Sequence, residues 1–174
     1  MEHGCLSKNG FLSSTDAAEL TTLPSVERIS KGPVAVIECI EDIPCNPCES
    51  SCKFGAIQVG EDITSCPQFF EEKCTGCGAC VYGCPGLAIF MIDGSGEGNM
   101  GSISFPHEFL PLPAVGQIVD VVNRAGEVIC RGKVEKALTA KISDRTPVLQ
   151  VQVPKDLLME ARGIKRLQSR AKEE

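Results

Sequence analysis

The sequence predicts an α+β fold in which a cysteine-rich repeat precedes a small antiparallel β region. Three observations indicate this fold. Four cysteines crowd into residues 74–84, an approximate copy of that pattern stands at residues 45–52, and alternating apolar and polar residues dominate the second half. The expected segments are an N-terminal extension (1–31), a cysteine-rich domain (32–93), a Gly/Ser linker (94–102), a small β-barrel or sheet domain (103–154) and a C-terminal helix (155–174).

Composition excludes several classes of protein. Hydrophobic residues make up 43% of the chain and charged residues 23%, which suits a folded protein. The net charge of −6 argues against a nucleic-acid surface. No apolar run approaches the roughly 20 residues that a membrane span needs. The first residues lack the basic and apolar pattern of a signal peptide. We therefore expect a cytoplasmic protein without a membrane span.

The cysteine count points to bound iron or another metal. Of the 11 cysteines, 9 lie between residues 39 and 84. A secreted disulfide scaffold would need an export signal, and none is visible. Ligation of a metal or cluster in a reducing compartment is the better interpretation.

The first half of the chain contains an internal repeat. SSTDAAEL (13–20) can begin a short helix capped by Ser14 or Thr15. Apolar strands are expected at 32–39 and 86–93, and short ones at 56–59 and near Ile63. The order of strand, cysteine loop, short helix and strand thus occurs twice. CxxCxxxCKFGAI also matches CxxCxxxCPGLAI, which indicates a duplicated unit.

The second half is predicted to be mainly β. QIVDVVN (117–123), VICRGKVEKA (128–137) and VLQVQVP (148–154) alternate as antiparallel strands do, and a turn at 124–127 separates the first two. Pro154 ends the last strand, and the charged segment beyond it is predicted to be a helix. The result would be a barrel or folded sheet followed by that helix.

The most specific motif is CTGCGACVYGCP, residues 74–85. Its spacing, Cys-x2-Cys-x2-Cys-x3-Cys-Pro, is the one that holds iron–sulfur clusters in bacterial ferredoxins. The first three cysteines fit one [4Fe–4S] cube, and in two-cluster proteins the fourth reaches the other cube. A zinc ribbon is the alternative, but zinc sites use two separated cysteine pairs.

The upstream motif is irregular. Cys45, Cys48 and Cys52 supply its last three positions, and Asp42 stands where the first cysteine is expected. The expected ligands are Cys39, Cys45, Cys48 and Cys84 for cluster 1, and Cys52, Cys74, Cys77 and Cys80 for cluster 2. Cys39 is preferred because a thiolate suits iron better than a carboxylate. Asp42 and Cys66 remain alternative ligands. Lys53 stands where proline is expected after Cys52, which leaves open whether Cys52 binds cluster 2. Cys66, which is followed by Pro67, could replace Cys52 as that ligand.

Residues 32–93 resemble the two-cluster [4Fe–4S] bacterial ferredoxins, which implies a ferredoxin-like (βαβ)2 domain. IECIEDIPCNPCESSCKFGAI, EEKCTGCGACVYGCPGLAIF and the tail VGQIVDVVNRAGEVICRGKVEK with VPKDL together resemble the small ferredoxin-like subunits of FAD-dependent amino-acid or amine dehydrogenases. These include proline, hydroxyproline, sarcosine-like and opine dehydrogenase complexes. The resemblance implies a hetero-oligomer in which a partner with FAD oxidises a C–N bond. Two [4Fe–4S] clusters in this chain would relay the electrons to an external acceptor.

No catalytic motif is evident, so we expect an electron-transfer subunit and not an enzyme. GxSxG and a phosphate-binding loop are missing from the sequence, and the glycine-rich segment GSGEGNMG (94–101) is interpreted as a linker because no convincing helix follows it. One alternative is a catalytic iron–sulfur component with a labile iron at Asp42. Its acid–base groups would have to be Glu38, Glu41 or Glu49, which are expected to be solvated charges. A zinc-stabilised binding module is the other alternative.

Overall fold

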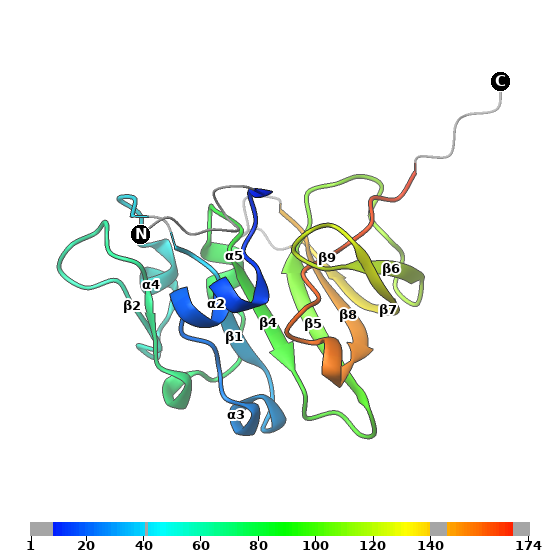
Figure 1. The fold of residues 1–174 in the computed structure, drawn as a ribbon, viewed down its shortest axis with the longest axis horizontal. Helices are drawn as coiled ribbons and strands as arrows, with labels where there is room; N and C mark the ends of the chain where they lie inside the picture. Colours follow the sequence, from blue (N-terminus) through cyan, green and yellow to red (C-terminus); the bar gives the residue numbers. More distant parts are fainter. Residues whose placement is uncertain (1–8, 41, 140–145, 169–174) are drawn as a thin grey trace.

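A computed structural model describes residues 9–40, 42–139 and 146–168. Within these ranges, one seven-stranded antiparallel sheet has the order β1-β4-β5-β8-β7-β6-β9, and β2 and β3 form a separate two-stranded sheet. Figure 1 shows the cysteine-rich half at the left and the later strands at the right, with β4 and β5 between them. The structure therefore combines α and β elements, as predicted, and its helices are few and short.

The cysteine-rich half has the duplicated order that the sequence predicts. Its elements are β1 (Val34–Ile37), α4 (Pro47–Ser51), β2 (Ile57–Gln58), β3 (Gln68–Phe69), η1 (Glu71–Lys73), α5 (Ala79–Gly83) and β4 (Ile89–Asp93). β1 pairs with β4 and β2 pairs with β3, both antiparallel. The strand expected near Ile63 is wrong. Thr64 there donates its N–H and hydroxyl to Asp62, which favours a turn, and the strand forms at β3 instead.

Two short helices precede this unit. α2 (Ser14–Leu20) confirms the predicted helix, but its cap is Ser13, one residue earlier than expected. Ser13 and Asp16 form a capping box in which each side chain accepts from the other residue's backbone N–H. α3 (Val26–Ser30) is capped by Ser25. Both helices are coloured blue in Figure 1.

The later strands extend the sheet begun by β1 and β4. They are β5 (Met100–Pro106), β6 (Ile118–Val122), β7 (Val128–Leu138), β8 (Val148–Pro154) and β9 (Gly163–Ile164). β5 was not predicted, and its first three residues fall in the expected linker. Residues 94–99 instead connect β4 to β5, which pair with each other. The Gly/Ser composition therefore marks a hairpin connection followed by a strand.

The predicted C-terminal helix is wrong for residues 155–168. Only the short 3-10 helix η3 (Lys155–Leu157) forms there, and β9 follows it. The backbone N–H groups of Arg162 and Lys165 donate to the carbonyls of Val122 and Asp120, so the chain after Ala161 pairs with β6 and does not continue as a helix. Its remaining part, 169–174, lies outside the described residues.

Among the described residues, one hydrophobic core runs through both halves. It includes Val36 and Ile92 beside the cysteine loops, and Ile103, Val134 and Val151 in the later strands, all at most 2% exposed. Ile103 pairs with Ile92 on one side and with Val151 on the other, so it joins the two halves. The division into a cysteine-rich domain and a β domain remains a prediction.

Candidate iron–sulfur site

The cysteine ligands expected for cluster 2 surround a cavity. Cys52, Cys74, Cys77 and Cys80 line it together with apolar side chains of β1 to β4, among them Ala35, Ile57, Phe69 and Met91. Burial, together with the nearby Cys74, Cys77 and Cys52, raises the pKa of the Cys80 thiol to about 12. Cys52, from the upstream motif, thus lies with the three cysteines of the downstream one.

Glycines allow the loop around this cavity to follow a close path. Gly76 and Gly78 have φ angles of +74° and +76°, which side chains strongly disfavour. A Cβ atom on Gly76 would lie 2.4 Å from the Pro33 carbonyl oxygen. The loop therefore approaches Pro33, just before β1, more closely than a residue other than glycine at position 76 would permit.

Arg28 of α3 fixes the start of the same loop. Its guanidinium donates to the carbonyl oxygens of Cys74 at 2.7 Å, Pro33 at 2.9 Å and Glu71 at 3.3 Å. Ser25 adds contacts to the Glu71 carboxylate through its N–H and hydroxyl. The N-terminal segment thus stabilises the backbone that presents Cys74.

Three cysteines expected for cluster 1 also lie together. Cys48 on α4 is buried, and burial raises its pKa to about 11. The Glu49 N–H lowers this pKa, whereas the neighbouring Cys84 and Cys39 raise it. Cys39, at the end of β1, therefore lies within electrostatic reach of Cys48 and Cys84.

The two motifs hold their last cysteines, Cys52 and Cys84, in the same way. The Ala56 N–H donates to the Cys52 sulfur at 3.2 Å, and the Ala88 N–H donates to the Cys84 sulfur at 3.4 Å. The carbonyls of these alanines accept from the N–H groups of Phe70 and Glu38, both at 2.9 Å. N–H···S bonds stabilise thiolates and influence the potential of a bound cluster. Lys53 in place of proline does not alter this arrangement.

The remaining candidate ligands lie on the loop between β1 and α4 or near it. The Cys45 N–H donates to the Ile63 carbonyl at 3.2 Å, which anchors the residue just before α4. Cys66 lies beside Asp42, with 3.6 Å between its sulfur and the carboxylate. The two alternative ligands thus contact each other, and the choice among Cys39, Asp42 and Cys66 stays a prediction.

The donors around the cavity fit an iron–sulfur cluster. Soft thiolates are the ligands that such clusters use, and apolar walls limit access of water. Across the part of the chain that the structure describes, no three Cys, His, Asp or Glu side chains are placed to hold a single metal ion. A cube binds each thiolate at a different iron, so its ligands stand apart around a cavity. Cys52, Cys74, Cys77 and Cys80 would hold a cluster here.

Glu38 departs from the expected solvated charge. Its side chain is 8% exposed and paired with Arg124 and Arg162. Burial acts to raise the pKa of this carboxyl, but the hydrogen bonds and charges of the two arginines outweigh it and the net pKa is lowered. Glu49 is half-buried on α4, and Glu41 lies outside the described residues.

Sequence reasoning missed the three arginines that hold the cysteine loops. Arg28 lies far from Cys74 in sequence, and Arg124 and Arg162 lie farther still from Glu38. No local spacing signals such contacts.

Comparisons with known proteins support the iron–sulfur assignment. The 4Fe-4S binding domain family matches residues 67–90. A component of an ion-translocating oxidoreductase complex from Methanosarcina acetivorans is 51% identical over 47 residues, which are 27% of this chain and 17% of the relative. A component of the Na⁺-translocating ferredoxin:NAD⁺ oxidoreductase complex from Acetobacterium woodii is 50% identical over 38 residues, 22% of this chain and 11% of the relative.

Residues 67–90 therefore form a [4Fe–4S] binding domain of the kind found in ferredoxins. The chain spans less than a fifth of the length of either curated relative. No solved structure matches it. Among the described residues, no helix is both long enough and apolar enough to cross a membrane.

Proposed function

We propose that this chain is an electron-transfer subunit that carries two [4Fe–4S] clusters. The observation that supports this best is the exchange of cysteines between the two motifs. Cys52 accompanies Cys74, Cys77 and Cys80, whereas Cys84 accompanies Cys48 and Cys39. Such an exchange suits two adjacent clusters. Cys45 completes the proposed set for cluster 1.

The clusters would supply one-electron chemistry, since a [4Fe–4S] cube gains or loses a single electron. The chain itself would bind them, limit access of water and tune their potentials through the N–H groups of Ala56 and Ala88. Cys77 is the exposed member of its set, whereas Cys80 is buried. Electrons would therefore pass most directly between cluster 2 and a partner at the Cys77 edge.

The proposed electron donor is an FAD-containing amino-acid or amine dehydrogenase subunit. Its flavin would take a hydride from the substrate's C–N unit and return two electrons, one at a time, to this chain. An external acceptor would then collect them. Support comes from the sequence resemblance, and the two curated relatives are themselves subunits of oxidoreductase complexes by name. We also propose that the chain is located in the cytoplasm.

Metal and sulfide analysis of the purified chain tests the two-cluster content. We expect about eight iron and eight sulfide per chain, and dithionite reduction should give an EPR spectrum with interacting clusters. About four iron would reduce the proposal to one cluster. Zinc without sulfide would overturn the proposal in favour of a zinc-stabilised binding module. A change in the EPR signal of a labile iron when substrate is added would favour a catalytic component.

Co-purification from the native source tests the partner. Recovery of a flavoprotein that reduces the clusters when an amino acid or amine is added would support the proposed donor. Recovery of a ferredoxin:NAD⁺ oxidoreductase complex would instead place the chain with the curated relatives.

A further inference from the structure

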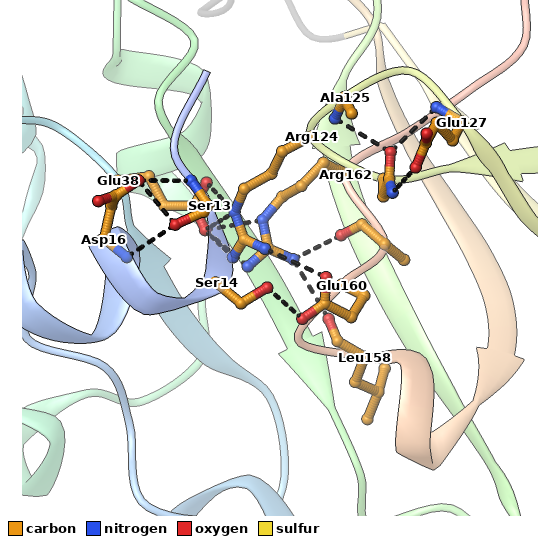
Figure 2. Close-up of polar contacts among 12 residues, drawn as sticks. Ser13, Ser14, Asp16, Glu38, Arg124, Ala125, Glu127, Leu158, Glu160 and Arg162 are labelled. Carbon is orange, nitrogen blue, oxygen red and sulfur yellow. Dashed lines mark hydrogen bonds and ion pairs between the residues drawn. The ribbon is translucent and has the colours of Figure 1, made fainter. Parts of the chain in front are cut away.

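A buried cluster of charged side chains lies beside the proposed first iron–sulfur cluster. We name it the arginine clamp and define it as Glu38, Arg124 and Arg162. The side chains of these residues are only 8%, 8% and 5% exposed. Figure 2 shows the two guanidinium groups next to each other between Glu38 and Glu160.

Hydrogen bonds fix Glu38 firmly within the clamp. Arg124 Nε donates to both carboxylate oxygens at 3.1 Å, and its Nη2 donates to Oε1. Arg162 donates to Oε1 from Nε at 2.9 Å and from Nη2 at 2.6 Å. The Glu38 carboxylate thus accepts five hydrogen bonds from two arginines. The planar guanidinium groups each donate more than one of these bonds, which fixes the position of the carboxylate.

The arginines are in turn anchored in the C-terminal part of the chain. Arg124 follows β6 and lies 3.7 Å from the Glu160 carboxylate, which also accepts from Ser14. Arg162 precedes β9, donates to the Leu158 and Ala161 carbonyls, and stacks over Phe90 at 5.0 Å. The clamp therefore joins the later strands to the end of β1.

Two short paths lead from the clamp to the proposed ligands of cluster 1. Glu38 directly precedes Cys39 in the chain. The Glu38 N–H also donates to the Ala88 carbonyl, and the Ala88 N–H donates to the Cys84 sulfur. Displacement of Glu38 would therefore shift the ligand Cys39 and the peptide that contacts Cys84.

Burial of this cluster needs an explanation, because removing charges from water is costly and a well-packed apolar group is often as stable. Glu38 carries one negative charge and the arginines carry two positive charges, so the three clamp residues are net positive. The Glu160 carboxylate, 3.7 Å from Arg124, offsets part of this charge, but it is 40% exposed and therefore screened by solvent. A positive charge in a medium of low permittivity stabilises the reduced, more negative form of a nearby cluster. The matching position in the other half is Phe70, which is uncharged.

We propose that Arg124 and Arg162 are positioning residues for the first cluster, holding Cys39 and the Ala88 peptide in place through Glu38 and raising the potential of that cluster. This inference rests on the proposed two-cluster function. It explains how an irregular motif, with Asp42 in place of its first cysteine, can still present a complete set of thiolates.

A redox titration of the full chain, followed by EPR, tests the proposal with three variants. Glu38→Gln removes one negative charge, so we expect a higher potential for the first cluster. Arg124→Met removes one positive charge and should lower it. The double variant E38Q/R124M has the same net charge as the native clamp and leaves no unpaired buried carboxylate. It should fold even if Arg124→Met does not, and its potential should return towards that of the native chain.

The control variant is Arg28→Met, which acts on the other half-site. We expect it to reduce occupancy of the second cluster and to leave the potential of the first unchanged. Shifts of equal size in both clusters, or an unchanged potential of the first cluster in Glu38→Gln, would overturn the clamp proposal. A native chain that binds only one cluster would instead remove the two-cluster part of the proposed function, so the two failures are distinguishable.

Discussion

The two cysteine half-sites share a backbone design but are supported differently. In each, an alanine N–H donates to the crossing cysteine and the alanine carbonyl accepts from the residue after a strand. The downstream half-site has a complete motif, and Arg28 holds it through backbone carbonyls alone. The upstream one lacks its first cysteine and depends on the buried carboxylate of Glu38. An incomplete motif therefore coincides with side-chain support from distant residues.

The substitution with the largest expected effect tests which residue completes the upstream half-site. Cys39→Ser should lower iron and sulfide to about half, because one cube loses a thiolate ligand. Asp42→Asn and Cys66→Ser should leave both contents unchanged. Iron and sulfide analysis after reconstitution is the measurement. The reverse pattern, with loss in Asp42→Asn and none in Cys39→Ser, would contradict the assignment of Cys39.

Ile103→Ala tests whether the two regions unfold together. Ile103 is fully buried in β5 and pairs with both β4 and β8, so its truncation should lower the free energy of unfolding by about 2–5 kcal/mol. Denaturant unfolding followed by circular dichroism and by cluster absorbance should show one shared, shifted transition. Val115→Ala is the control, because Val115 is 66% exposed and should change stability by less than about 0.5 kcal/mol.

Two separate transitions, of which only one shifts in Ile103→Ala, would instead support the predicted division into two domains. Such a result would mean that the shared core contributes little to cooperativity between the regions. The difference between the two half-sites would then concern the cysteine-rich domain alone, without a contribution from the later strands to its stability.

The sequence predicted the local features well because they depend on local spacing. The repeat, the strand at 148–154 and the turn after β6 follow from alternation and from turn residues. β5 was missed because its alternating side chains include Gly101, Ser102 and Ser104, which resemble a linker. Gly101 is required there, since a Cβ atom would lie 2.6 Å from the Asp93 carbonyl oxygen.

Long-range contacts explain the remaining errors. The C-terminal segment has a composition typical of helices, yet β6 offers backbone partners that only the folded chain reveals. The clamp was also unpredictable, because Glu38 and Arg162 are brought together only by the full sheet. Charged residues near cysteine motifs are usually solvated, and nothing in the sequence marks Glu38 as buried.

Gly76→Ala and Gly55→Ala compare the packing of the two half-sites at similar backbone angles. Both glycines have positive φ, +74° and +65°, so an alanine at either costs about 1–2 kcal/mol in the free energy of unfolding. Only Gly76 also meets a neighbouring backbone, whereas Gly55 has open space. Gly76→Ala should therefore be the more destabilising change and should lower occupancy of the second cluster. Equal losses in thermal and denaturant unfolding would show that the loop can move away from Pro33.

The smallest expected effect concerns acid stability and isolates the charge of Glu38. Its pKa is below the ordinary value of 4.5 in the folded chain, because the arginine contacts outweigh burial. Its ionisation therefore stabilises the fold fully above pH 4.5, and this contribution is lost as the pH falls through the lowered pKa. The difference in unfolding free energy between the native chain and Glu38→Gln should be constant above pH 4.5 and should shrink below it.

Denaturant unfolding of the cluster-free chain across this pH range is the measurement, because bound iron would add its own pH dependence. Glu160→Gln is the matched control, since this carboxylate faces the same arginine at 3.7 Å but is 40% exposed. Solvent screens such a pair, so its variant should follow the native curve closely. A Glu38→Gln curve parallel to the native one at every pH would mean that the arginines hold Glu38 by shape and hydrogen bonding without favouring its charge. The potential shift expected from the clamp would then lose its electrostatic basis, and the two half-sites would differ in geometry alone.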